Sequence, residues 1–96
     1  MLVVLLPFTA QGQSFNCRTA ERSDEVLIGQ TPRLSALDEQ MSSLYYTLRN
    51  QLSGPERRAL EASHQRRWLQ SRIDCGRYFT CIEEHYERRL RFLRRY

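Results

Sequence analysis

Lysine is absent from this chain, and glycine and proline are scarce. All 15 basic residues are arginine, against 11 acidic residues, and the 96 residues include only 4 glycines and 3 prolines. No long alternation of apolar and polar residues occurs, so a β-sheet is not expected. The formal net charge is +4, with 41% hydrophobic and 27% charged residues. This composition favours one small all-α domain with a modest core.

A strongly apolar run occupies residues 1–10, at the N-terminus. It is too short to span a bilayer, which needs about 20 residues. It is similar to the apolar region of a secretory signal, although no basic residue precedes it. The small residues Ala10 and Gly12 could form the cleavage site, near residue 12. A start further upstream and a buried N-terminal element are the alternatives. We expect residues 1–12 to be a signal-peptide remnant and residues 13–96 to be one periplasmic or secreted domain without a transmembrane span.

Three cysteines in a small exported chain predict one disulfide and one leftover thiol. Cys75 and Cys81 are the expected pair, because Gly76 interrupts the helix between them and the short intervening segment can reverse the chain. Closing so short a loop stabilises the fold by about 2 kcal/mol. Cys17 is then left unpaired.

The spacing of apolar residues predicts one short helix and three long ones. The expected elements are a short helix over residues 26–28, capped by Ser23, Asp24 and Glu25 and ended by Gly29, then long helices over residues 31–52, 55–74 and 79–93. Short linkers force consecutive helices to fold back on each other. The expected fold is therefore an antiparallel three-helix bundle with a short extra N-terminal helix and one disulfide in the last interhelical loop.

Polar side chains fall on the helix faces that should pack together. The expected members of this polar network are Asp38, Glu61, Gln65, Trp68, Arg72, Tyr86 and Arg89. A buried guanidinium without a carboxylate costs several kcal/mol, so we predict that Asp38 or Glu61 pairs with Arg72 or Arg89. We interpret the set as a structural network rather than a site, with Trp68 in the core rather than exposed as a ligand platform.

No motif in the chain indicates catalysis. There is no glycine-rich phosphate loop, nucleophile elbow, metalloprotease motif or plausible carboxylate pair. Only Cys75, Cys81, His64 and His85 could build a zinc site, but their spacing is looser than in ordinary zinc motifs and a disulfide explains the cysteines more simply. We expect no enzyme activity, no cofactor, no metal and no small-molecule substrate.

Four arginines cluster on the outer side of the last predicted helix, opposite its apolar residues. They are Arg88, Arg91, Arg94 and Arg95. They can form an ordinary solvated face, or they can bind an anionic envelope polymer or nucleic acid. A continuous positive ridge would favour the second interpretation.

A succession of short motifs extends over residues 15–93. It reads Phe15-x-Cys17, Leu37-Asp38, Leu44-Tyr45, Gln65-x-x-Trp68-Leu69-x-x-Arg72-x-x-Cys75, Cys81 and Tyr86-x-x-Arg89. This succession resembles the lysozyme inhibitor LprI N-terminal-like family. The resemblance implies a small, exported, non-enzymatic helical domain of the bacterial envelope, and some members are linked to inhibition of lysozyme.

The resemblance also implies a difference in the cysteines. Family members usually carry a fourth cysteine, in an Ile-Cys pair after the short first helix, where this chain has Ile28 and Gly29. The N-terminal disulfide is therefore expected to be missing, Cys17 to lack its usual partner, and residues 15–29 to be held less tightly than in relatives.

Inhibition of lysozyme by direct contact would need a docking surface. Many lysozymes are strongly basic, so an inhibitor with a charge of +4 needs a local acidic patch to avoid long-range repulsion. The candidate partner contacts lie on the outer side of the last helix near the disulfide loop and are Tyr78, Phe79, Glu83, Glu84 and Glu87. The three carboxylates would contact basic residues of lysozyme, and the two aromatic rings would supply the apolar contacts of the interface. The partner expected from this reading is lysozyme or another envelope protein.

Overall fold

The structure is a computed structural model that describes residues 15–96, apart from the side chain of Gln65. Its elements are α2 (Ser23–Gln30), α3 (Pro32–Gln51), α4 (Gly54–Ala62), the π-helical segment η2 (Ser63–Trp68), α5 (Leu69–Cys75) and α6 (Phe79–Leu93). The chain is helical with no strand in this range, which confirms the all-α prediction. The proposed signal-peptide remnant, residues 1–12, lies outside the described residues.

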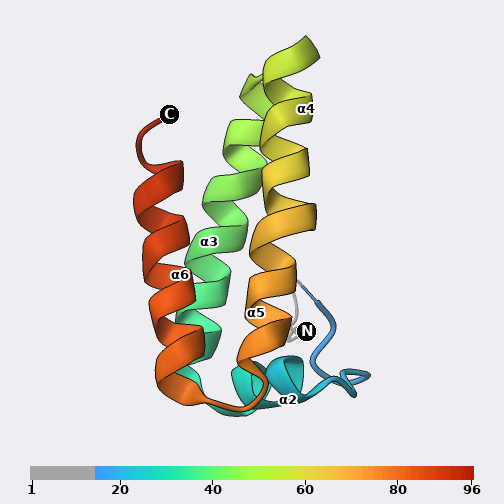
Figure 1. The fold of residues 1–96 in the computed structure, drawn as a ribbon, viewed down its shortest axis with the longest axis vertical. Coiled ribbons are helices and arrows are strands. Elements are labelled where there is room, and N and C mark those ends of the chain that lie inside the picture. The colour runs from blue at the N-terminus through green and yellow to red at the C-terminus, as the bar shows by residue number, and fades with distance from the viewer. Residues whose placement is uncertain (1–14) are drawn as a thin grey trace, which may run out of the picture.

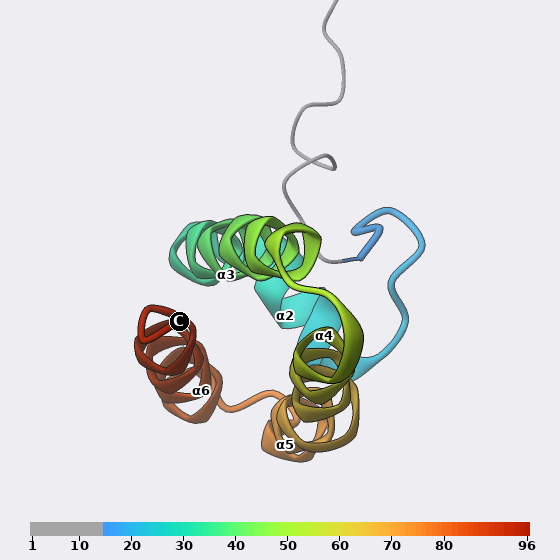
Figure 2. The ribbon, with the colours of Figure 1, turned by 90° about the horizontal axis from the view of Figure 1, so that it is seen from above.

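Three helical rods stand side by side, and the short helix α2 lies at one end of them (Figure 1). One rod is α3, another is α6, and the third is continuous from α4 through η2 to α5, because the backbone stays helical at both junctions, Ala62 and Leu69. Seen from above, the three rods form a triangle (Figure 2). The antiparallel bundle with an extra N-terminal helix is thereby confirmed. None of the described helices is both long and apolar enough to cross a membrane.

Glycine makes both chain reversals possible. Gly54 has φ +57° and Gly76 has φ +61°, in the left-handed region that other residues rarely adopt. After Gly76 the chain returns as α6, and the disulfide between Cys75 and Cys81 spans this second reversal. The predicted disulfide in the last interhelical loop is confirmed. Cys17 has a free thiol.

The core is built from apolar residues that are spaced by three and four along α3 and α6 and by eight and seven along the third rod. Its buried members are Ile28, Leu34, Leu37, Met41, Tyr45, Leu60, Trp68, Cys75, Ile82, Tyr86, Leu90 and Leu93. The rod α6 packs mainly on α3, while α2 packs on both α3 and α5. The short helix therefore joins two rods at their common end.

Two details of the helices differ from the predictions. The helix α2 starts at Ser23 and continues through Gly29 to Gln30, and Asp24 is buried inside the bundle instead of capping the helix. The third rod ends at Cys75 and contains the η2 segment, which the sequence analysis did not predict. A π-helical turn has wider i to i+5 hydrogen bonds and accommodates an extra residue. It therefore changes which side chains face the core.

Cys17 lies against Gly29, the position at which the resemblance described above would place a cysteine. A β-carbon placed on Gly29 would lie 3.1 Å from Cys17 Sγ and 3.3 Å from Cys17 Cβ. In disulfides the two β-carbons are about 3.5–4.5 Å apart. A small shift of one chain segment would therefore bring a cysteine at position 29 into bonding distance of Cys17.

Substitution Gly29→Cys should create a second disulfide with Cys17. Closing this loop should raise the free energy of unfolding by about 3 kcal/mol relative to Gly29→Ser, which adds the same β-carbon without a sulfur. Urea unfolding of the oxidised proteins measures the difference, and thiol titration with non-reducing peptide mapping identifies the bond. Two reactive thiols in oxidised Gly29→Cys, or a disulfide between molecules, would contradict the geometry.

Candidate functional site

Arg72 is the centre of a buried ionic network, with only 1% of its surface exposed. Its Nε lies 2.8 Å from Asp24 Oδ2, its Nη2 lies 3.4 Å from Glu25 Oε2, and its Nη1 lies 3.7 Å from Asp38 Oδ1. The contact between Asp38 and Arg72 is one that the sequence analysis proposed. The contact with Asp24, which is shorter, was missed because that residue was assigned to a helix cap.

Tyr86 connects the network to α6. Its hydroxyl donates to Asp38 Oδ1 at 2.7 Å and accepts from Arg72 Nη1 at 3.2 Å. Burial, and then the charge of Asp38, raise the pKa of Tyr86 far above its ordinary value, so the phenol stays neutral. The guanidinium of Arg72 also lies over the rings of Phe15 and Trp68, at 5.3 and 5.6 Å from their centroids.

The two carboxylates of α2, the buried Asp24 and the partly buried Glu25, both pair with Arg72. Burial alone would raise the pKa of the Asp24 carboxyl, but hydrogen bonds and charge from Arg22 and Arg72 outweigh it and keep that pKa below its ordinary value. Glu25 accepts from Arg22 Nη2 at 2.8 Å as well as from Arg72. Asp24 therefore stays ionised and neutralises the buried guanidinium.

Glu61 lies outside this network, contrary to the prediction. It is half-exposed and pairs with Arg49 at 2.7 Å and Arg57 at 3.6 Å. The side of the rod that faces the core instead carries Leu60, His64 and Trp68. The η2 segment explains the difference, because its wider turns keep residues spaced by four on one side. The side chain of Gln65, another predicted member, lies outside the described residues.

His64, which the sequence analysis considered only as a metal ligand, is part of an aromatic stack. Its ring lies between Tyr45, at a centroid distance of 4.1 Å, and Trp68, at 5.3 Å. Trp68 is itself in the core, and its Nε1 donates to the carbonyl of His85 at 3.1 Å. Burial, and then the charges of Arg89 and Arg72, lower the pKa of His64 to about 4. The ring is therefore neutral at pH 7.

Arg89 is buried but does not pair with a carboxylate in the described part of the chain, so the predicted pairing of Asp38 or Glu61 with Arg72 or Arg89 is met through Asp38 and Arg72 alone. Its Nη1 and Nη2 donate to Ser63 Oγ, each at 3.3 Å. Its Nη2 also lies 3.5 Å from His64 Nδ1, and its guanidinium lies 5.0 Å from the centre of the Phe92 ring. Arg72 and Arg89 thus occupy different electrostatic environments within one small bundle.

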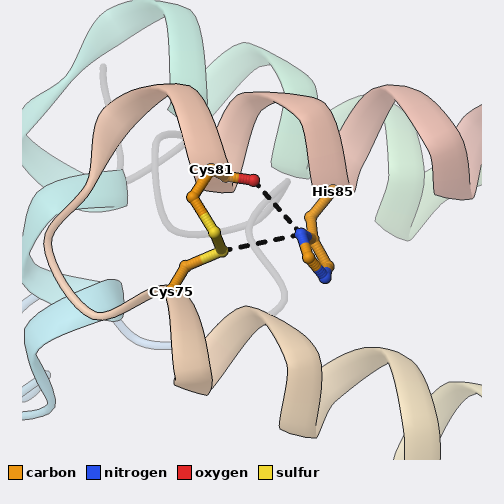
Figure 3. A group of neighbouring side chains, drawn as sticks. All are labelled: Cys75, Cys81 and His85. Carbon is orange, nitrogen blue, oxygen red and sulfur yellow. Dashed lines mark hydrogen bonds between the residues drawn. A yellow bond between two sulfur atoms is a disulfide. The ribbon is translucent and has the colours of Figure 1, made fainter.

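The disulfide lies at the end of the bundle beside His85 (Figure 3). His85 Nδ1 is 3.5 Å from Cys75 Sγ and 3.2 Å from the Cys81 carbonyl oxygen. Among residues 15–96, these three residues form the one group of metal-type ligands, with ligand atoms within 4.8 Å of one another, and His64 is not part of it. The metal ligand of a cysteine is its thiolate. With both sulfurs joined, the group offers no thiolate in the oxidised protein.

The predicted contact residues lie at the start of α6. Tyr78 is 78% exposed and Phe79 is 39% exposed. Glu83 and Glu87 both accept from Arg33 of α3, at 3.1 Å each, whereas Glu84 has only Arg88, at 4.0 Å, as an ion-pair partner in the described range. Two of the three carboxylates are therefore already neutralised by a link between α3 and α6.

The predicted arginine strip is exposed to solvent. It comprises Arg88, Arg91, Arg94 and Arg95, all at the surface of the second half of α6 or just beyond it. Arg88 lies near Glu84, and no ion pair within residues 15–96 involves the other three. These charges are free to meet an anion.

A hollow of about 480 Å³ opens between α3 and the third rod, above the Arg72 network. Its charged lining is already paired, Arg22 with Glu25 and Arg49 with Glu61. Both signs of charge are present and compensate each other. The lining of the hollow therefore has no excess of positive or negative charge that would attract an oppositely charged ligand.

Comparison with models of known protein families, with curated proteins and with solved structures found no match to this chain.

Substitution Asp24→Asn should destabilise the fold strongly. It leaves Arg72 buried with weaker counter-charges, and breaking a buried pair costs about 3 kcal/mol or more. Urea unfolding at pH 7 measures the loss. Glu61→Gln, which also removes one carboxylate charge but from a half-exposed pair, should leave stability nearly unchanged. Equal losses of unfolding free energy in the two variants would show that the buried pair contributes no more to stability than the half-exposed pair.

Stability should fall as the pH falls from 6.5 to 4 because of His64. Its pKa drops from an ordinary 6.5 to about 4 on folding, so the unfolded chain binds more protons in this window and the free energy of unfolding decreases with acidity. The full effect is about 3 kcal/mol, and it is absent above pH 6.5. Urea unfolding at several pH values measures it. His64→Gln should remove most of the slope between pH 6.5 and 4.5, and an unchanged slope would assign it to other groups.

Proposed function

We propose that this protein is a non-enzymatic, exported helical domain of the bacterial envelope that inhibits lysozyme by protein–protein contact. The basis is the resemblance of residues 15–93 to the LprI-like family, together with the surface at the start of α6. The main contact is the aromatic pair Tyr78 and Phe79. The activity needs no cofactor and no metal.

The observation that carries the proposal is the exposure of these two aromatic rings on a rigid part of the fold. The Cys75–Cys81 disulfide closes the short segment that contains both residues, and Arg33 ties α6 to α3 through Glu83 and Glu87. Exposed aromatic residues on a fixed backbone lose little entropy on binding and are enriched in the energetic centres of interfaces.

The charge distribution indicates how such a contact would form. The net charge of +4 opposes a basic partner, and Arg33 neutralises two of the three carboxylates near the aromatic pair. Glu84, with 58% of its side chain exposed, is the carboxylate available to a partner. Apolar burial of the rings, with Glu84 as a single charged contact, would therefore supply the affinity.

The buried residues also support the family resemblance. Four residues of the shared motifs meet in one network to which all three rods contribute: Asp38 from α3, Trp68 and Arg72 from the third rod, and Tyr86 from α6. Cys17 lies against position 29, where the resemblance places a cysteine. Residues that recur as a set in a family motif are expected to lie together when they stabilise a common fold. The motif is thus accounted for by structure, and the docking surface lies outside it.

The purified oxidised protein should inhibit the hydrolysis of peptidoglycan by a c-type lysozyme, measured as the initial rate of turbidity loss. Replacing Tyr78 and Phe79 together by alanine should weaken inhibition by at least about tenfold, because each ring is an exposed anchor of the interface. Tyr46→Ala is the matched control, since it removes a comparably exposed aromatic ring from α3. Circular dichroism should show both variants folded.

Absence of inhibition at micromolar protein, or equal weakening by Tyr46→Ala, would contradict this proposal. In the first case, binding to an acidic polymer that weakens steeply with salt would favour the arginine strip of α6 as the functional surface. In the second case, the aromatic pair would have no specific role.

A further inference from the structure

Among residues 15–96, Arg89 is a buried charge with no carboxylate in ion-pair contact. It is 5% exposed, and within residues 15–96 its Nε has no hydrogen-bond partner. The groups that it does contact, Ser63 and His64, are neutral. The hydroxyl of Ser63 donates its hydrogen to the Leu60 carbonyl at 2.8 Å, so it can only accept from Arg89.

Neutral acceptors leave the positive charge of Arg89 uncompensated. Burial lowers the pKa of its guanidinium, whereas the pKa of Arg72, beside its phenol and carboxylates, is raised. An ionised group out of water needs a counter-charge to be stable. Since the chain supplies one to Arg72 but none to Arg89 in its described part, a counter-charge from outside is the natural complement.

Arg89 lines a surface groove of about 310 Å³ between α6 and the part of the third rod formed by η2 and α5. Its polar lining includes Ser63, Arg67, Ser71, Arg88 and Arg89, and we call it the arginine groove. No residue lining it in the described range is acidic, and three arginines line this one space; of these, Arg88 has Glu84, outside the lining, at 4.0 Å. Arg67 is exposed and has no ion pair within residues 15–96.

We propose that the arginine groove binds a phosphate group, with Arg89 at its base and with Arg67 and Arg88 as exposed donors. Guanidinium groups form paired, charge-assisted hydrogen bonds with phosphate oxygens. A tetrahedral phosphate offers oxygens in several directions and more than one negative charge, which suits arginines approaching from two elements. The hydroxyl of Ser71 adds a further donor.

The size of the groove leaves room for more than an inorganic ion. Small-molecule sites span about 300–1,000 Å³, so this groove is at the lower end of that range. Phe92 also lines it and provides an apolar wall. The phosphate can therefore be free, or it can belong to a phospholipid headgroup. This site is separate from Tyr78 and Phe79 and does not depend on inhibition of lysozyme.

The test uses the oxidised full chain and compares phosphate with chloride at equal ionic strength. Phosphate should raise the thermal midpoint, and calorimetric titration should give the dissociation constant. Arg67→Gln should weaken phosphate binding by roughly tenfold or more, because a charge-assisted contact is lost, without changing stability in chloride. Arg58→Gln on α4, an exposed arginine outside the groove, makes the same change of charge and should leave binding unchanged.

Arg89→Met adds a second measurement. If Arg89 binds an external anion, Arg89→Met should be at least as stable as the parent in chloride, and phosphate should no longer raise its thermal midpoint. A variant that is folded, less stable in chloride and still responsive to phosphate would overturn the role of Arg89. Should Arg89→Met fail to fold, the comparison of Arg67→Gln with Arg58→Gln still decides.

Vesicles distinguish the two sources of phosphate. Binding to phosphatidylglycerol vesicles, but not to phosphatidylcholine vesicles, that Arg67→Gln weakens and inorganic phosphate competes away would assign the groove to a lipid headgroup. A response to inorganic phosphate without vesicle binding would assign it to a free phosphate. Equal shifts by phosphate and chloride, or equal weakening by Arg67→Gln and Arg58→Gln, would overturn the proposal.

Discussion

Neutralisation of the Arg72 guanidinium is the constraint on which the rest of this fold depends. Asp24 comes from α2, Asp38 from α3, Arg72 from α5 and Tyr86 from α6, so one network joins four elements at one end of the bundle. A short helix such as α2 has little surface of its own to bury, and isolated helices of its length are unstable in water. Its two carboxylates therefore add ionic contacts with Arg72 to the apolar packing of Ile28.

The need of a buried charge for an opposite charge also distinguishes the end of the bundle near α2 from its middle. Near α2 every buried charge meets its opposite, and the disulfide fixes the loop that follows. Halfway along, the η2 segment turns Ser63 and His64 toward Arg89 and supplies acceptors without charge. π-helical turns frequently mark functional positions, because they hold backbone in a less favourable geometry than an uninterrupted helix.

The helices were predictable from the sequence because their signals are local. The residues at three- and four-residue spacing in α3, the Thr31-Pro32 start and the glycines at both reversals each act within a few positions. The face of the third rod was not predictable in the same way. In an uninterrupted α-helix, Leu60 and Arg72, twelve residues apart, would point in directions about 120° apart around the helix axis. Both are buried here, because the wider turn of η2 lies between them. A period of about 3.6 residues per turn therefore places Glu61, and not Leu60, on the same face as Arg72.

The partners of buried charges were the least predictable feature, since they depend on contacts between distant parts of the chain. Asp24 had the local signature of a helix cap, and 48 residues separate it from Arg72. Arginine needs either a carboxylate or another anion when it is removed from water. Sequence can show that Arg72 and Arg89 lie on packed faces, but only the fold shows that a single one of them meets carboxylates. Arg89, the residue with neutral neighbours, is the position that we propose to meet an external anion, and it is distinct from the aromatic residues proposed to meet a protein partner. Recognition of a protein and recognition of an anion can therefore coexist on α6 without competing for the same side chains.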